Sequence, residues 1–141
     1  MASTSEDELI ETIVGFFRET DGLFSATSRP LGLTPQQAQM LCFTQHLQPS
    51  FGELAGLLHC DKTNITGLVD RLEKRGLVIR QPDAQDRRMT RVHLTSEGEE
   101  LTKRFQHAFN SALTSRLRDW TAADRKDLLR LLQSATTALR G

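Results

Sequence analysis

Apolar residues recur at helical spacing along most of the chain and predict a largely helical protein. The first predicted helix runs from about Ser5 to Ala26 and ends in a break over Ser28 to Gly32. Its apolar positions, with acidic residues between them, are Leu9, Ile10, Ile13, Val14, Phe16, Phe17, Leu23 and Phe24. The second begins at Thr34-Pro35, an N-cap residue followed by proline at the first helical position, and runs to about His46.

The middle of the chain predicts two helices joined by a tight turn at His59-Cys60. Ser50 and Glu53 have capping-box spacing at the start of the first helix, which has one apolar face (Leu54, Leu57 and Leu58). Asp61 caps the second helix, which ends at Arg75 with Gly76 as its stop. The apolar stripe of this second helix is Ile65, Leu68, Val69 and Leu72.

Two segments of strand character follow, Leu77 to Arg80 and Thr90 to Leu94. The polar stretch between them, residues 81–88, predicts a β-hairpin with a long charged tip. Ser96 with Glu99 has capping-box spacing for a helix to about Leu117, and Thr121 with Asp124 caps a last helix. The broad apolar face of that helix is Leu128, Leu129, Leu131, Leu132, Ala135, Ala138 and Leu139. The fold class is therefore mainly α with a small β-hairpin wing, a winged helix-turn-helix flanked by N- and C-terminal helices.

Composition fits one domain and narrows the class of protein. With 141 residues, of which 38% are hydrophobic and 26% charged, the chain can form a core. No apolar run is long enough to cross a bilayer, and the acidic, polar start has no signal-peptide pattern, so we expect a cytoplasmic location. Two cysteines and four scattered histidines give no disulfide framework and no metal site.

The net charge of zero hides an asymmetry. Residues 1–27 hold six acids and one base, a net charge of −5, whereas residues 61–95 hold eight bases and five acids, a net charge of +3. A local positive zone can attract a polyanion even in a neutral protein. Solvated charged helix faces would give the same counts, so the charge alone leaves both interpretations open.

The second helix of the predicted pair has the chemistry of a DNA-reading helix. Such a helix can lie in the major groove of double-stranded DNA with its N-terminal end toward the bases. Asn can hydrogen-bond adenine, Lys or Arg can bond guanine, and Thr offers a hydroxyl and a methyl group. Gly67 leaves a patch without a side chain, and Arg87 and Arg88 at the hairpin tip can reach a minor groove or the phosphate backbone. The outward polar residues are Lys62, Thr63, Asn64, Thr66 and Arg71.

These segments resemble the MarR family of bacterial transcription regulators. The resemblance rests on Phe51 to Ala55, on Asp61 to Val78, and on the wing motif Asp86-Arg87-Arg88 followed by Val92-His93-Leu94-Thr95 and Gly98. The wing motif is the most specific of these patterns, and the likeness in helix order extends from about Leu9 to Leu139.

The resemblance implies a single domain over residues 1–141 that forms a homodimer. About 1–30 and 96–141 would be dimerisation helices, and about 31–95 the DNA-binding winged helix-turn-helix. Phe16, Phe17, Trp120 and the C-terminal leucines would face the partner, although packing within one subunit would also bury them. A two-fold dimer reads a pseudo-palindromic operator with half-sites about one turn, ~10 bp, apart.

The family's base-reading positions correspond to Lys62, Thr63, Asn64, Thr66 and Arg71, and its wing-tip arginine to Arg88. The resemblance implies that Asp86 orients Arg88 by an ion pair, with Arg87 against the phosphate backbone. We expect Asp61 to act mainly as an N-cap. Asp70 should lie in an ion pair on the helix surface rather than on DNA, because an acid near phosphate is repelled.

The resemblance also implies a small aromatic or anionic effector. The sequence identifies no pocket for it beyond Arg18 and Arg29 as candidate anion partners. We interpret Cys42 and Cys60 as structural thiols. No cofactor and no enzyme are expected, since the chain lacks a Gly-rich phosphate loop, a catalytic triad context and a paired carboxylate motif.

A repressor is favoured over an activator, because a dimer bound to a promoter blocks polymerase without further machinery. The alternative is a winged helix that has lost DNA binding and serves as a protein-interaction module. Arg87 and Arg88 favour DNA, because a wing that binds protein would more often carry apolar or acidic residues there.

Overall fold

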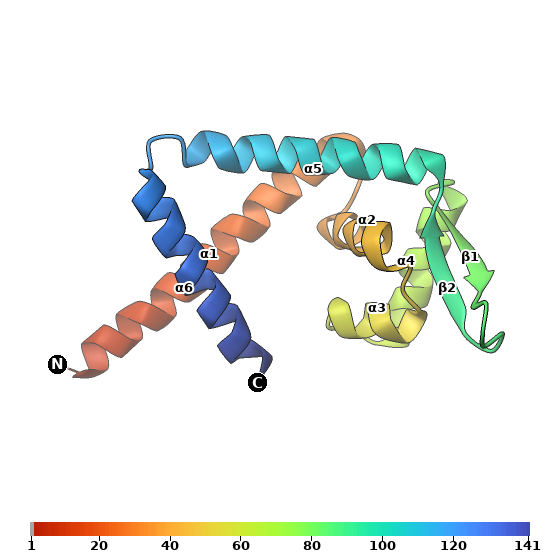
Figure 1. Cartoon of the computed structure of the whole chain (residues 1–141), viewed down its shortest axis with the longest axis horizontal. Helices are drawn as coiled ribbons and strands as arrows, with labels where there is room; N and C mark the ends of the chain where they lie inside the picture. Colours follow the sequence, from red (N-terminus) through yellow and green to blue (C-terminus); the bar gives the residue numbers. More distant parts are fainter. Residues whose placement is uncertain (1) are drawn as a thin grey trace. The chain divides into compact units, whose positions relative to one another are not determined.

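The helices and strands follow one another in the predicted order. The computed structural model describes residues 2–141, with side chains from Ser5 onward. Its elements are α1 (Ala2–Ser28), the 3-10 turn η1 (Arg29–Leu31), α2 (Pro35–Leu47), α3 (Phe51–Leu57), α4 (Lys62–Lys74), β1 (Val78–Pro82), β2 (Thr90–Leu94), α5 (Ser96–Arg116) and α6 (Ala122–Arg140) (Figure 1). They fall into two compact units, residues up to Phe109 and Asn110–Gly141, with α5 running through the boundary. The predicted fold class, mainly helical with a two-stranded wing, is confirmed.

Side-chain caps start α2, α3 and α4 at the predicted residues, although the box predicted at Ser50 and Glu53 forms only its Ser50 half. Thr34 and Gln37 form a reciprocal capping box on α2, and Ser50 accepts a hydrogen bond from the Glu53 backbone N–H at 3.2 Å on α3. Asp61 accepts from the Asn64 N–H at 2.8 Å, so its predicted role as the N-cap of α4 is confirmed.

The helix pair turns at residues with left-handed backbone. His59 (φ 51°) ends α3, and the Cys60 N–H then donates to the Ala55 carbonyl at 3.0 Å. Gly76 (φ 75°) ends α4 in the same way, because the Leu77 N–H donates to the Leu72 carbonyl at 3.0 Å. Leu77 is therefore held by the end of α4, and the first strand begins at Val78 rather than at Leu77 as predicted.

The wing is an antiparallel hairpin in which Val78 pairs with Leu94 and Pro82 with Thr90. β1 continues past the predicted end at Arg80 to Pro82. Proline is tolerated there because the sheet has two strands, so a missing N–H can face the open edge. The base of the hairpin is tied to the α2–α3 connection, since the Val92 N–H donates to the Pro49 carbonyl at 2.9 Å.

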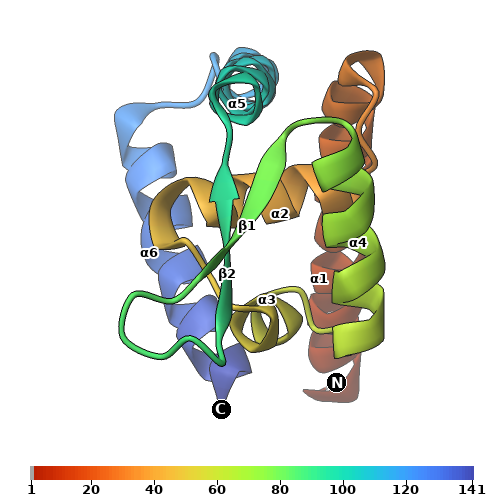
Figure 2. The same ribbon diagram turned by 90° about the vertical axis from the view of Figure 1, so that its right-hand side faces the viewer.

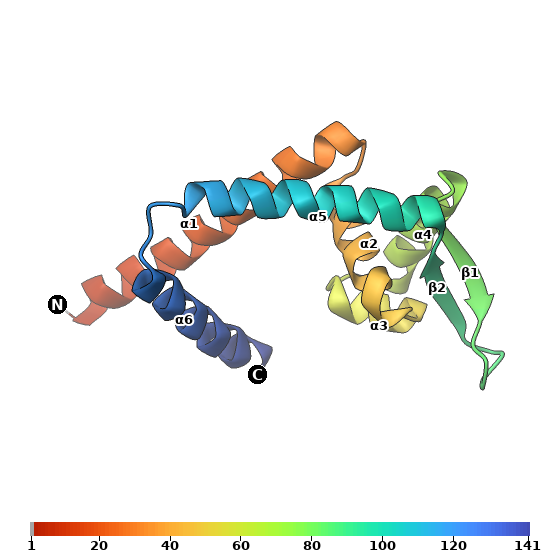
Figure 3. The same ribbon diagram turned by 45° about the horizontal axis from the view of Figure 1, so that its top comes forward.

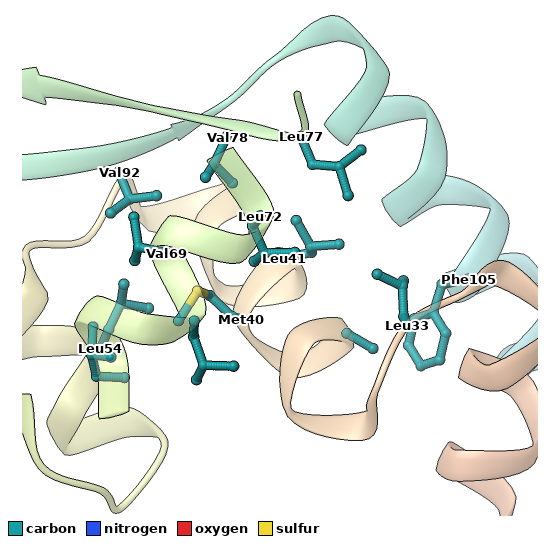
Figure 4. Close-up of a cluster of buried hydrophobic side chains, with 13 residues drawn as sticks. Leu33, Met40, Leu41, Leu54, Val69, Leu72, Leu77, Val78, Val92 and Phe105 are labelled. Atoms are coloured by element: carbon teal, nitrogen blue, oxygen red, sulfur yellow. The ribbon is translucent and has the colours of Figure 1, made fainter. Parts of the chain in front are cut away.

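One hydrophobic core holds the wing, α4 and their neighbours together (Figure 4). Leu54 of α3, Val69 and Leu72 of α4, and Val92 of β2 are fully buried. Phe105 of α5 is 2% exposed and stacks edge-on against Phe24 of α1, with ring centroids 4.7 Å apart. The core thus fixes α4 relative to the wing and to the C-terminal end of α1.

The first turn of α5 is capped one residue earlier than predicted. Thr95, not Ser96, accepts the hydrogen bond from the Gly98 N–H, at 3.0 Å. The Thr95 hydroxyl in turn donates to the Gly76 carbonyl at 2.6 Å, and its N–H donates to the Leu77 carbonyl at 3.0 Å. Thr95 therefore joins α5 to the end of α4 through bonds that a local capping motif does not reveal.

Several large apolar side chains on the helices are more than half exposed. On α1, Phe16 is 52% and Phe17 69% exposed. In the second unit, α6 begins with the predicted Thr121–Asp124 capping box, and Leu129 and Leu131 are more than half exposed. No helix in residues 2–141 combines the length and the apolar character that a membrane span requires.

Candidate DNA interface

The N-terminal half of α4 and the wing face each other across a groove on the first unit. Figures 1 and 2 show α3, α4 and the hairpin side by side. The view in Figure 3 also places the hairpin next to α4. The groove has a volume of about 610 Å³ and receives residues from all three elements. Its lining residues are Ser50, Phe51, Gly52, Lys62, Thr66, Arg80, Asp86, Arg88, Met89 and Thr90.

The structure brings three of the predicted DNA contacts to this groove: Lys62, Thr66 and Arg88. The Lys62 stem lies over Gly52, with Cε 3.7 Å from the place of a Cβ on that glycine. The Thr66 hydroxyl donates to the Lys62 carbonyl at 2.9 Å, and its side chain is exposed. The other predicted contacts, Thr63, Asn64, Arg71 and Arg87, are exposed but are not among the lining residues.

The bare patch predicted at Gly67 is covered. Nη2 of Arg71 lies 3.4 Å from the place of a Cβ on Gly67, so the guanidinium folds back along α4. Close approach of a ligand to this patch requires Arg71 to move. The side chain is exposed and flexible, so such a movement is open to it.

The five acids of the positive zone, residues 61–95, make contacts within that zone. Several of its cations are left without an ion-pair partner among the described side chains. Asp61 caps α4, Asp70 and Glu73 face Arg80, Asp83 pairs with Arg91, and Asp86 binds a backbone N–H. Among the side chains that the structure describes, Lys62, Arg71, Arg87 and Arg88 form no ion pair. The surface that carries the predicted DNA contacts is therefore more positive than the net charge of +3 for residues 61–95 suggests.

Asp86 supports the wing differently from the prediction. The expected ion pair with the Arg88 guanidinium is not formed among the described side chains. Asp86 Oδ1 instead accepts from the backbone N–H of Arg88 at 3.1 Å. A short acidic side chain bonds readily to the N–H two residues ahead of it in a turn. This contact shapes the loop and leaves the Arg88 side chain available to solvent.

Asp70 forms the predicted ion pair, but its partner is Arg80 of β1 rather than a residue on its own helix. Arg80 was not predicted as a site residue, although it lines the groove. The alternation of side chains along a strand could have placed it on the face opposite Ile79. Nothing in the local sequence links it to an acid ten residues earlier on another element.

Arg91 clamps the loop end of the wing and was also missed. Its guanidinium pairs with Asp83 across the hairpin, lies 3.6 Å from Glu53, and donates to the Gln48 carbonyl at 3.1 Å. Asp83 also accepts from the N–H groups of Gln85 and Asp86 at 3.0 and 2.9 Å. The hydrogen bond from Arg91, with these backbone bonds, lowers the pKa of the Asp83 carboxyl to about 2.

We expect the wing to loosen in acid. Asp83 has a folded pKa below its ordinary value of 3.8, so its ionised form stabilises the hairpin above that pH. This contribution is lost as the pH falls from about 4 toward 2. Amide hydrogen exchange of the hairpin across this range measures the effect. Asp83→Asn should exchange faster already at pH 7 and show a smaller change with pH; an unchanged hairpin in this variant would refute the clamp.

The cysteines do not form a reactive or metal-binding cluster in residues 5–141. Cys42 and Cys60 are free and half-buried, and both pack against the core. Burial raises the pKa of the Cys42 thiol, which favours the unreactive protonated form and agrees with a structural role. No group of three or more His, Cys, Asp or Glu residues in the described part of the chain could hold a metal ion.

Comparison with known proteins shows a similarity to one family. Residues 33–90, which contain the groove and the wing up to Thr90, match the sequence model of the MarR family. A 70-residue segment is 39% identical to the HTH-type transcriptional regulator YsmB of Bacillus subtilis. Residues 33–90 carry the sequence pattern of the MarR family, and the chain is similar to members of that family. The aligned segment spans about half the length of that curated relative, 48%, and 49% of this chain.

Solved structures share the MarR fold over nearly the whole chain. Wild-type apo MarR from Escherichia coli is 26% identical, with a TM-score of 0.78 over 90% of this chain and 95% of that one. A MarR family protein from Bacillus stearothermophilus superposes with a TM-score of 0.90 at 20% identity over 100% and 99% of the chains. MarR proteins are regulators of transcription, so the prediction that this chain is not an enzyme is confirmed by this similarity.

Proposed function

We propose that this protein, which is similar to the MarR family, is a homodimeric repressor that binds double-stranded DNA at a pseudo-palindromic operator. In this proposal the N-terminal half of α4 reads the major groove through Lys62, Thr63, Asn64 and Thr66, with Arg71 one turn further on. The wing tip reaches the neighbouring groove or backbone through Arg87 and Arg88.

The observation that carries the proposal is the groove between α4 and the wing. Lys62 and Arg88 come from separate elements and both line it without an ion-pair partner among the described side chains. Cations held apart on a helix and a wing can follow the phosphates on either side of a DNA groove. A wing adapted to bind protein would have no need for unpaired arginines at its tip.

The test is a fluorescence-anisotropy titration against the DNA upstream of the protein's own gene, with a scrambled duplex as control, at two salt concentrations. We expect tight, sequence-selective binding that weakens as salt rises. Equal, weak binding to both duplexes would contradict DNA reading at this promoter and favour the protein-interaction module. Reporter transcription from the same promoter, lower with the protein than without it, tests repression.

The dimer part of the proposal is supported by the exposed apolar side chains of α1. Leu9, Ile10, Ile13, Val14, Phe16 and Phe17 are each more than half exposed. Exposing a continuous apolar stripe of this kind to water costs free energy, and packing against a second helix would bury it. In the second unit, Leu129, Leu131 and Leu139 of α6 are likewise more than half exposed.

We expect Phe17→Lys to shift the protein from dimer toward monomer, because Phe17 is 69% exposed within one chain and a lysine would carry its charge into the subunit contact. Light scattering after size exclusion, over a concentration series, measures the shift. Glu11→Lys places the same residue among the acidic positions of α1 and should leave the dimer intact. A wild-type monomer at all concentrations would refute the dimer.

We extend the proposal to release by a small aromatic or anionic effector. A pocket of about 490 Å³ beside η1 is lined by Leu31, Ala108 and His107, with the two cations Lys103 and Arg104 outnumbering the one acid, Glu100. This chemistry suits an aromatic carboxylate. Arg18 and Arg29, the predicted anion partners, are exposed and are not among its lining residues. Benzoate that neither raises the melting temperature nor weakens DNA binding would contradict this part.

A further inference from the structure

Arg80 holds an unusual position on the wall of the groove. Its side chain is 33% exposed and points from β1 toward α4, where it pairs with Asp70 and where its Nε lies 3.7 Å from Glu73. The guanidinium also lies over the Phe51 ring of α3, 5.4 Å from the ring centroid. One side chain thus contacts both helices of the helix-turn-helix from the first strand of the wing.

The contacts of Arg80 differ from those of the other cations in the groove. Lys62 and Arg88 line the groove without an acidic partner in the described part of the chain, whereas Arg80 faces two carboxylates. Because the guanidinium pairs with Asp70 and lies over the Phe51 ring, it cannot turn outward without breaking both contacts. A cation neutralised in this way contributes little to the attraction of phosphate.

We propose that Arg80 is a positioning residue for DNA binding, which sets the distance between the wing and α4 through Asp70, Glu73 and Phe51. This inference rests on the proposed function. The wing and α4 carry the predicted DNA contacts, and α3 lies beside them. Arg80 joins all three elements at one point. A planar guanidinium suits this junction, since it can pair in its plane and stack on an aromatic face at once.

For Asp70→Asn, this proposal and simple electrostatics predict opposite changes in DNA affinity. Asp70 is 56% exposed and stands on the helix that would enter the major groove. If Asp70 only repelled phosphate, its neutralisation in Asp70→Asn would strengthen DNA binding. If Asp70 holds Arg80 and thereby the wing, the same change should weaken binding although it removes a negative charge.

The experiment measures the fluorescence anisotropy of the upstream duplex titrated with the protein over a salt series. We expect Asp70→Asn and Arg80→Gln each to weaken binding by about five- to tenfold, a size typical of coupled neighbouring residues. The slope of log affinity against log salt should stay as in the wild type, because no phosphate contact is lost. Glu99→Gln, which removes an exposed acid on α5, is the matched control and should bind within about twofold of wild type.

Two results would overturn the proposal. Equal or tighter binding by Asp70→Asn would show that the ion pair does not position the wing. A salt slope reduced by about one in Arg80→Gln would make Arg80 a direct phosphate ligand instead.

Hydrogen exchange separates this proposal from the proposed function. The amides of β1 and β2 should exchange faster in Asp70→Asn than in wild type, with or without DNA. Unchanged exchange would overturn the positioning role. If the wild-type protein does not bind the upstream duplex selectively, the proposed function at that promoter is overturned, whatever the exchange result. The role of Arg80 in positioning the wing for DNA would then be overturned as well.

Discussion

Replacing Arg88 by alanine should weaken operator binding by about 10- to 100-fold, the range for an arginine that contacts a base edge or a narrow minor groove. The side chain is exposed, lines the groove, and pairs with no acid among the described residues. The loop that carries it is shaped by the Asp86 carboxylate on the Arg88 backbone N–H, a contact that alanine retains. The loss should therefore come from DNA contact and not from a change in the wing.

Anisotropy with the upstream duplex and its scrambled control measures this effect, and circular dichroism checks that the variant is folded. Arg118→Ala is the matched control, because Arg118 is an exposed arginine that lines neither the groove nor the pocket beside η1. It removes the same charge and should bind nearly as well as wild type. Wild-type affinity in Arg88→Ala would show that the wing tip does not contact DNA. An equal loss of affinity in both variants would show that only the net charge of the protein matters.

The sequence predicted best those features that depend on neighbours along the chain. The N-caps at Thr34, Asp61 and Thr121 and the stop at Gly76 each need only residues within one turn, and the structure confirms them. The cap of α5 was missed by one residue because Thr95 and Ser96 are both good N-cap residues. Contacts to the end of α4, 19 residues earlier for the bond to Gly76, distinguish them, and local spacing does not contain that information.

In the candidate site, too, local spacing predicted some features, whereas contacts between distant segments could not be predicted. Its exposed polar residues follow from the helical stripe, since positions off the apolar face of α4 must face outward. The supporting contacts join distant segments: Arg91 binds the Gln48 carbonyl 43 residues away, and Arg80 meets Asp70 on another element. Which of eight bases pair with which of five acids in residues 61–95 depends on tertiary packing, so the sequence could count the charges but not identify the free ones.

Gly98→Ala should destabilise the fold by about 2 kcal/mol or more, the upper range for overpacking against a rigid neighbour. A Cβ at Gly98 would lie 2.0 Å from the Leu77 carbonyl oxygen and 3.0 Å from its carbon. Both are backbone atoms, and the Thr95 N–H and the Gly76–Thr95 bond hold that backbone in place. Relief of the clash requires α5 to move away from the end of α4, which would also break these bonds.

Helix propensity alone predicts the opposite sign for this change. Alanine is favoured over glycine by about 1 kcal/mol inside a helix, so a Gly98→Ala protein as stable as wild type would show that α5 does not pack as closely on Leu77 as the structure has it. Gly56→Ala in α3 is the matched control, because a Cβ there meets no atom within 4 Å. Urea unfolding at one fixed protein concentration compares the two, since the stability of the proposed dimer would depend on concentration. We expect the midpoint to fall for Gly98→Ala and to rise or stay for Gly56→Ala, so that the difference between two identical substitutions measures the close approach of α5 to the base of the wing.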